Sequence, residues 1–202
     1  MTDLSASAFL ELAAGRRGHF RMESGYHSAL WLDLDALFAA PARVRPLVTK
    51  LAEALRPYRV DAVCGPLLGG AFLAQIVAEA LSAEFWYAQP APPSGTTGLF
   101  QARYELPPAF AGRLPNARVA IVDDVISAGS SLRATDAALR QRGAHVVAVG
   151  ALLALGHVGT THFADQGVPV EAVAHAEFEM WAPTECPHCA AGVPLESVSP
   201  SA

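Results

Sequence analysis

The sequence predicts an α/β fold, in which a doubly wound, mostly parallel sheet carries a small N-terminal hood. Three observations support this fold class. Short apolar runs alternate with amphipathic segments between residues 41 and 160, as expected when each strand is followed by a crossover helix. The run Val119–Val122 is continuously apolar, which is typical of a parallel strand covered on both faces. The 202 residues are 52% apolar, enough for one domain with a sizeable core.

The first forty residues predict a helix and then a hairpin. Ser5–Ala14 favours a helix that Gly15 ends, because a serine can cap its start and glycine ends helices readily. Gly18–Leu34 alternates apolar and polar residues around Gly25, which predicts the hood. We expect a single domain over residues 1–202, divided into a hood (1–40), a core (41–160) and a tail (161–202).

The core predicts strands and helices in alternation. Apolar residues at helical spacing predict a helix that Pro57 ends, and a long loop or ribbon rich in Pro, Gly and Thr interrupts the later pattern. In chain order the predicted elements are helix Ala42–Arg56, strand Val60–Cys64, turn Gly65–Gly70, helix Ala71–Leu81, strand Glu84–Tyr87, ribbon Gln89–Gly112, strand Val119–Val122, helix Ser131–Arg142 and strand His145–Leu153. After Gly156 only short apolar pieces follow, and the last polar residues are expected to fray.

Composition excludes several classes of function. The net charge of −5, with 16% charged residues, gives no basic excess for a nucleic-acid partner. No uninterrupted apolar run reaches about 18 residues, so no membrane span is expected. No signal peptide is evident, and three cysteines do not make a disulfide framework. These features together favour a cytoplasmic protein.

Two adjacent acids mark the most informative motif. Asp123 and Asp124 follow the apolar run, at the strand end where open α/β sheets bind ligands. The small residues Ser127–Ser131 follow, so backbone N–H groups can approach a ligand closely at the start of a helix. Such a turn suits a phosphate, and the carboxylates suit sugar hydroxyls or a hydrated Mg²⁺. A plain strand–turn–helix with a serine cap is the alternative interpretation.

A second loop has the same setting. Leu67, Leu68, Gly69 and Gly70 lie between a predicted strand and a predicted helix, one βα unit earlier. Glycines let the backbone come close to a ligand. Alone, this loop could be a tight strand–helix connection; its position relative to the acid pair favours a second anion site.

The acid pair and its loop resemble the phosphoribosyl pyrophosphate (PRPP) loop of type I phosphoribosyltransferases. The resemblance implies that Asp123 and Asp124 contact the ribose hydroxyls and that the following loop holds the 5′-phosphate. It also implies that the earlier loop binds pyrophosphate, that Mg²⁺ acts with the substrate, and that Arg103 on a mobile loop takes part in catalysis. The residues assigned to PRPP are Asp123, Asp124, Ser127, Ala128, Gly129, Ser130, Ser131, Leu67, Leu68, Gly69 and Gly70.

The hood His19–Asp33 and the tail Cys186–Leu195 resemble the orotate branch of that family. The resemblance implies a base site under the hood, a homodimer, and PRPP and a nitrogenous base as substrates in pyrimidine synthesis. The implied base-site positions are Phe20, Glu23, His27, Trp31 and Leu155.

Basic residues that are usual in the orotate branch are replaced here. Glu23 stands where a Lys or Arg usually precedes Ser-Gly, Leu155 where an Arg meets the orotate carboxylate, and Gln89 where a Lys often lies. Arg103 is the only basic residue of segment 89–108. Three hypotheses stay open: an orotate enzyme with relocated basic contacts, an enzyme for another base such as a neutral one, and a catalytically weak or inactive sensor that binds PRPP or nucleotide.

The tail also carries Cys186 and Cys189 in a C-x-x-C pattern. They are weak zinc candidates, because tetrahedral zinc needs four ligands and the pattern supplies two. Cys64 or a histidine could complete such a site, and the sequence does not specify which. The alternative is a tail that simply packs against the fold.

Overall fold

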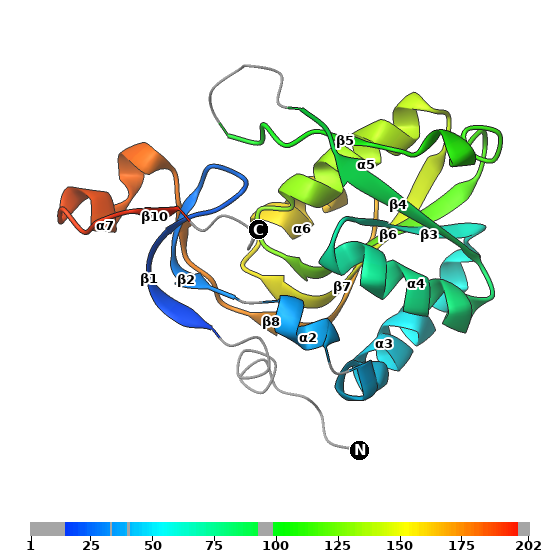
Figure 1. Ribbon diagram of the computed structural model, residues 1–202, viewed down its shortest axis with the longest axis horizontal. Coiled ribbons are helices and arrows are strands. Elements are labelled where there is room, and N and C mark those ends of the chain that lie inside the picture. The colour runs from blue at the N-terminus through cyan, green and yellow to red at the C-terminus, as the bar shows by residue number, and fades with distance from the viewer. Residues whose placement is uncertain (1–14, 33, 40, 93–98, 198–202) are drawn as a thin grey trace.

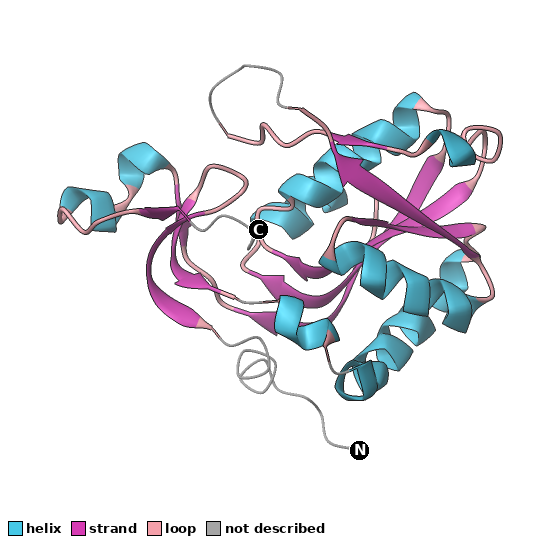
Figure 2. Ribbon diagram, in the orientation of Figure 1, coloured by secondary structure: helices cyan, strands magenta, loops and turns pink. Residues whose placement is uncertain are grey.

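The computed structural model describes residues 15–32, 34–39, 41–92 and 99–197. Within them, a six-stranded sheet has the order β5-β4-β3-β6-β7-β8, and its strands pair in parallel except β5, which is antiparallel to β4 (Figures 1 and 2). The strands are β3 Ala62–Pro66, β4 Glu84–Pro90, β5 Tyr104–Glu105, β6 Arg118–Ile126, β7 His145–Leu155 and β8 Val170–Ala176. The prediction of a mostly parallel α/β sheet is confirmed.

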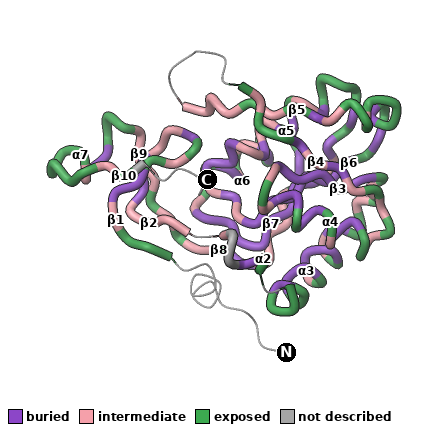
Figure 3. Tube along the Cα trace, viewed as in Figure 1, coloured by how far each residue is buried: buried purple, intermediate pink, exposed green. Residues whose placement is uncertain are grey.

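Helices cover both faces of this sheet. On one face, α3 (Pro41–Leu55) and α4 (Gly69–Leu81) pack with Val122 and Leu152 in one apolar cluster. On the other face, α5 (Ser130–Gln141) and α6 (Val158–Ala164) bury Leu132, Leu139 and Phe163 in a second cluster. Figure 3 shows the central strands buried between these layers. The sheet is therefore doubly wound.

The three helices predicted in the core match α3, α4 and α5 to within about two residues, the usual uncertainty of helix ends. In α3 the buried residues are Val44, Leu47, Val48, Leu51, Ala52 and Leu55, which is the apolar stripe expected of an amphipathic helix. The predicted ribbon is pinned at its base, because Gln89 pairs with Glu105 and Pro90 with Tyr104. Among the described residues there are also three short 3-10 turns, η1 Arg56–Tyr58, η2 Pro108–Phe110 and η3 Pro183–Glu185.

The hood is a second, four-stranded sheet with the order β10-β1-β2-β9. The predicted hairpin is present: β1 (Arg16–Arg21) and β2 (His27–Trp31) are antiparallel, and Gly25 turns with a φ of 85°. The tail adds β9 (Met180–Trp181) and β10 (Glu196–Ser197), with α7 (Pro187–Ala190) between them. The sequence left open that the tail packs against the fold, but it did not predict that the tail adds strands to the hood sheet.

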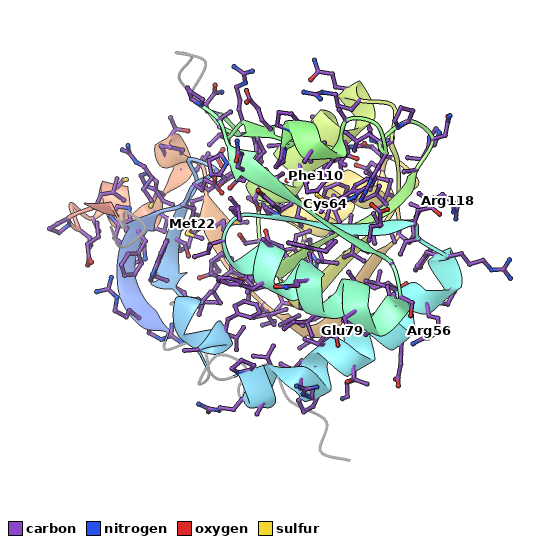
Figure 4. The ribbon with its side chains drawn as sticks, turned by 45° about the vertical axis from the view of Figure 1, so that its right-hand side comes forward. Met22, Arg56, Cys64, Glu79, Phe110 and Arg118 are labelled. Carbon is purple, nitrogen blue, oxygen red and sulfur yellow. The ribbon has the colours of Figure 1, made fainter. Side chains whose placement is uncertain are left out.

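The hood faces the carboxyl ends of the parallel strands (Figure 1). The short helix α2 (Asp35–Phe38) lies between hood strand β2 and helix α3 in chain order. Figure 4 shows Met22 in the hood, with Arg56 and Arg118 at the opposite end of the molecule. The predicted helix Ser5–Ala14 lies outside the described residues. Within the described part of the chain, no helix is both long and apolar enough to cross a membrane.

Candidate functional site

The sequence predicted the acid pair at the end of a strand. In the structure the pair lies inside β6, which continues to Ile126. Pairing between β6 and β7 continues to Ile126 and Ala154, whereas pairing between β6 and β3 stops at Ile121 and Cys64. Because β3 no longer pairs with β6 beyond Cys64, the edge of β6 that follows Ile121 faces Gly69 and Gly70 at the start of α4. Asp123 and Asp124 are each 7% exposed there, at the carboxyl edge of the sheet.

The two carboxylates are held by short-range hydrogen bonds. The Ser131 hydroxyl donates to Asp123 Oδ2 at 2.7 Å, and the Asp124 N–H donates to Asp123 Oδ1 at 3.1 Å. The Val125 N–H donates to Asp124 Oδ1 at 2.8 Å. Burial raises the pKa of Asp123 well above its ordinary range, and the neighbouring Asp124 charge raises it further. A ligand that brings hydroxyl donors or positive charge would stabilise this pair.

The loop after β6 turns at Gly129 into the start of α5. Gly129 has a φ of 75°, and no side chain caps the helix, so the first-turn N–H groups are available to a ligand. The Ser130 hydroxyl is buried and has no hydrogen-bond partner among the described residues. A phosphate oxygen would satisfy these donors, which supports the sequence-based prediction of a phosphate loop at residues 127–131.

The second loop lies directly against the acid pair. A Cβ on Gly70 would lie 2.7 Å from Asp123 Oδ1 and 2.6 Å from Pro66 Cδ, and a Cβ on Gly69 would collide with Asp124 Oδ2. Glycine is therefore needed at both positions for the loop to approach the carboxylates. The helix α4 also starts without a side-chain cap, so a second set of N–H groups points into the same region.

One cavity of about 1420 Å³ joins both loops to the hood. Of the residues predicted for PRPP, all except Gly70 line it, together with Glu23, Trp31 and Leu155 from the predicted base site. Phe20 is 1% exposed inside the hood, and His27 is 3% exposed and turns toward the tail. Neither of these two lines the cavity, and nor does Arg103, whose side chain is exposed on the ribbon.

Several lining residues were not predicted from the sequence. Arg16 and Arg21 of β1 are the basic residues among the described ones that line the cavity, and Tyr104 reaches it from the ribbon. The Tyr104 hydroxyl donates to Glu23 Oε1 at 3.2 Å, linking ribbon and hood. This bond lowers the pKa of Glu23, although burial of the carboxyl has the larger effect and raises it. In the sequence, the position of the basic residue Arg21 shortly before the hood turn was the signal that could have identified it as a cavity residue.

Known proteins resemble this chain over most of its length. Residues 33–171 match the model of the phosphoribosyl transferase domain. A protein named orotate phosphoribosyltransferase from Thermotoga petrophila is 33% identical over 181 residues, covering 89% of this chain and 88% of that protein. A protein of the same name from Thermus thermophilus is also 33% identical, covering 90% of this chain and 92% of the relative.

Solved structures agree with these relationships. The orotate phosphoribosyltransferase of Aeropyrum pernix superposes with a TM-score of 0.65 at 28% identity, over 84% of this chain and 92% of that one. An adenine phosphoribosyltransferase from Rhodothermus marinus, 22% identical with a TM-score of 0.54 over 72% of this chain and 86% of that one, shares the fold. The family, fold and enzyme class predicted from the sequence are confirmed: the chain belongs to the phosphoribosyl transferase domain family and is a PRPP-dependent phosphoribosyltransferase, a pentosyltransferase.

Proposed function

We propose that the chain transfers the 5-phosphoribosyl group of PRPP to orotate. A ring nitrogen of the base attacks ribose C1 while the bond from C1 to the pyrophosphate oxygen breaks, giving a nucleoside 5′-monophosphate and pyrophosphate. The observation that carries this proposal is one cavity lined by the two loops at the starts of α4 and α5, the acid pair and the hood. The relatives named orotate phosphoribosyltransferase at 33% identity support the choice of base.

The acid pair and the loops divide PRPP between them in this proposal. Asp123 and Asp124 accept hydrogen bonds from the ribose hydroxyls, and the loop 127–131 binds the 5′-phosphate. The loop Leu67–Gly70 offers N–H groups to the departing pyrophosphate. Positive charge develops on the ribose ring as the bond breaks, and the carboxylates beside the ring stabilise it. The protein therefore acts mainly by positioning and electrostatics.

The residues present fit a divalent cation bound together with PRPP. Two adjacent buried carboxylates, one with a raised pKa, offer the oxygen ligands that Mg²⁺ prefers. When bound, Mg²⁺ would neutralise the pyrophosphate and make it a better leaving group. Asp123 and Asp124 would hold this cation in the cavity together with the bound PRPP.

The orotate carboxylate needs a cation that Leu155, Glu23 and Gln89 do not supply. Arg21 lies on the hood strand and lines the cavity, and we assign this contact to it. Arg21→Gln should raise KM for orotate by about ten- to a hundred-fold, because a hydrogen bond to a charged group contributes about 1.5–3 kcal/mol. Arg17→Gln, on the same strand and outside the cavity lining, is the matched control. An unchanged KM for orotate in Arg21→Gln would remove this assignment.

Arg103 and a second copy of the chain complete the proposal. Arg103 closes with the ribbon over the pyrophosphate and excludes water.

Leu68 is 55% exposed and Phe72 is 44% exposed at the start of α4, and we propose this apolar surface as the homodimer interface. Phe72→Asp should shift the mass measured by light scattering from dimer to monomer, whereas a monomeric wild type would contradict this part of the proposal.

Pyrophosphate release from PRPP and Mg²⁺, measured with orotate and then with a panel of purine and pyrimidine bases, tests the function. Release with orotate is expected. Release with a different base alone would replace orotate and would make Glu23 and Leu155 specificity residues for a neutral base. No pyrophosphate release with any base, with PRPP binding retained, would favour the sensor hypothesis. The observation that favours a sensor is that segment 89–108 contains a single basic residue.

A further inference from the structure

Four metal-ligating side chains from opposite ends of the chain meet at the outer side of the hood. His19 lies on β1, His27 on β2, Cys186 immediately before α7 and Cys189 within it. One ligand atom from each of the four lies within 4.8 Å of all the others. We call these residues the hood–tail cluster. Figure 1 shows the blue strands β1 and β2 beside the red and orange tail that carries the two cysteines.

The spacing of the four atoms is that of a tetrahedral metal site. Zn²⁺ bonds of about 2.0–2.1 Å to nitrogen and about 2.3 Å to sulfur place tetrahedral ligand atoms about 3.3–3.8 Å apart. His19 Nε2 is 3.1 Å from His27 Nδ1, 3.4 Å from Cys186 Sγ and 3.7 Å from Cys189 Sγ. Cys189 Sγ is 3.3 Å from His27 Nδ1. The backbone therefore already holds the side chains at nearly the separations that a bound ion requires.

The tautomer of His19 turns a lone pair into the cluster. Its Nδ1 lies 2.9 Å from the Val193 carbonyl oxygen, which can only accept, so Nδ1 carries the proton of the neutral ring and donates it. Nε2 then has one lone pair, while His27 Nδ1 and two sulfur atoms surround it. Hydrogen bonds can satisfy that lone pair with one of these neighbours, whereas one cation satisfies all four groups together. A carbonyl partner behind a ligating histidine is the usual support of a metal site.

Burial adds to the argument for an ion. His19 is 1% exposed, and His27 and Cys186 are 3% exposed each. His188, which lies between the two cysteines, does not contribute a ligand atom to the cluster. Its ring stacks on the His19 ring, with 5.3 Å between the ring centroids, and meets the Trp181 ring edge-on, with 5.4 Å between the centroids. Cys64 is buried in the main sheet among Trp86 and Ile121, so it cannot complete the site with the tail cysteines.

We propose that His19, His27, Cys186 and Cys189 bind one structural Zn²⁺. Two thiolates and two imidazoles in tetrahedral array select zinc over the hard cations that prefer oxygen. All four positions are filled by protein, so the ion would take no substrate. It would fasten the tail to the hood strands, and Arg21, Met22 and Glu23 between the two histidines line the substrate cavity. The site would therefore fix the position of the hood over that cavity.

Metal content of the untagged, full-length protein tests the proposal directly. Protein purified with a reductant and without added chelator should contain one Zn²⁺ per chain by plasma mass spectrometry. Replacing Zn²⁺ with Co²⁺ should give the visible absorption of tetrahedral cobalt and a near-ultraviolet thiolate band. Cys189→Ser and His27→Gln should lose most of the zinc, whereas Cys64→Ala and His188→Gln, which remove a thiol and an imidazole outside the cluster, should keep it.

Thermal unfolding gives a second readout that does not depend on activity. A strong zinc chelator should lower the Tm of the wild type and leave the Tm of Cys189→Ser unchanged. If Cys186→Ser does not fold, Cys189→Ser, altered at an exposed residue, still decides the matter. Reduced wild type that contains no zinc and shows no tetrahedral cobalt spectrum would overturn the proposal. So would equal zinc loss in the control variants, or a Cys186–Cys189 disulfide that persists under reductant.

Discussion

Replacing Asp123 with Asn should separate a functional acid pair from a structural one. Asp123 accepts one hydrogen bond from Ser131 and one from the Asp124 N–H. A carboxylate has about four acceptor positions, so about two remain for ribose hydroxyls. Asn keeps one acceptor oxygen and replaces the other with an amide donor, so one charged hydrogen bond of about 1.5–3 kcal/mol is lost and the other becomes neutral and about 1 kcal/mol weaker. Together these losses predict a decrease of about 10²- to 10³-fold in kcat/KM for PRPP.

The same replacement should not destabilise the fold. Because burial and Asp124 raise the pKa of Asp123, the native state keeps a proton that the unfolded chain has already lost. The contribution of this group to the free energy of unfolding is therefore greatest below its ordinary pKa, about 4, and falls as pH rises through the raised value. Asn is uncharged at every pH. The variant should match or exceed the wild type in stability at neutral pH, and this difference should shrink below about pH 4.

Initial rates at varied PRPP, with urea unfolding of the same samples, measure both effects. Asp136→Asn is the matched control: Asp136 is also buried, forms an ion pair with Arg140 at 2.7 Å, and does not line the cavity. This control should keep its kcat/KM for PRPP. A kcat/KM of Asp123→Asn within about threefold of wild type would refute the reasoning. An activity loss that only follows a loss of folded protein would refute it too.

Three further replacements test neighbouring parts of the site. Gly70→Ala should abolish PRPP binding in calorimetry, because its Cβ would lie 2.7 Å from Asp123 Oδ1; wild-type affinity would mean that the loop can withdraw without loss. Gly129→Ala should lower the free energy of unfolding by about 1–2 kcal/mol in urea, since a left-handed φ of 75° suits glycine; no change would show that the loop adopts another conformation. Tyr104→Phe should raise the pKa of Glu23 further in an NMR titration, because the hydrogen bond that lowers it is lost; a fall would contradict that assignment.

The two loops and the acid pair that we assign to PRPP could be located from the sequence because their signals are local. An apolar strand, two acids and a run of small residues lie within thirteen consecutive positions, 119–131, and each part forms the element that its residues favour. The position of Asp123 inside β6 could not be predicted, because it depends on where β3 stops pairing. The strand β8 was missed for a similar reason: it is an edge strand, only partly buried, so its apolar pattern is weak.

The base side of the cavity depends on contacts between distant parts of the chain. Cys186 contacts His19 across 167 positions, and β10 pairs with β1 from the other end of the sequence. No local pattern encodes which distant segments meet, so the sequence could offer the two cysteines only as half of a metal site. This difference between local signals and contacts of distant segments explains why the sequence predicts the family but not the residues that contact the base. The residues proposed to bind PRPP are placed by their own strand–loop–helix units, whereas Arg21, Glu23 and Tyr104 are placed by the packing of hood, ribbon and tail. A basic contact can therefore move from one element to another around the base while the PRPP loops stay unchanged.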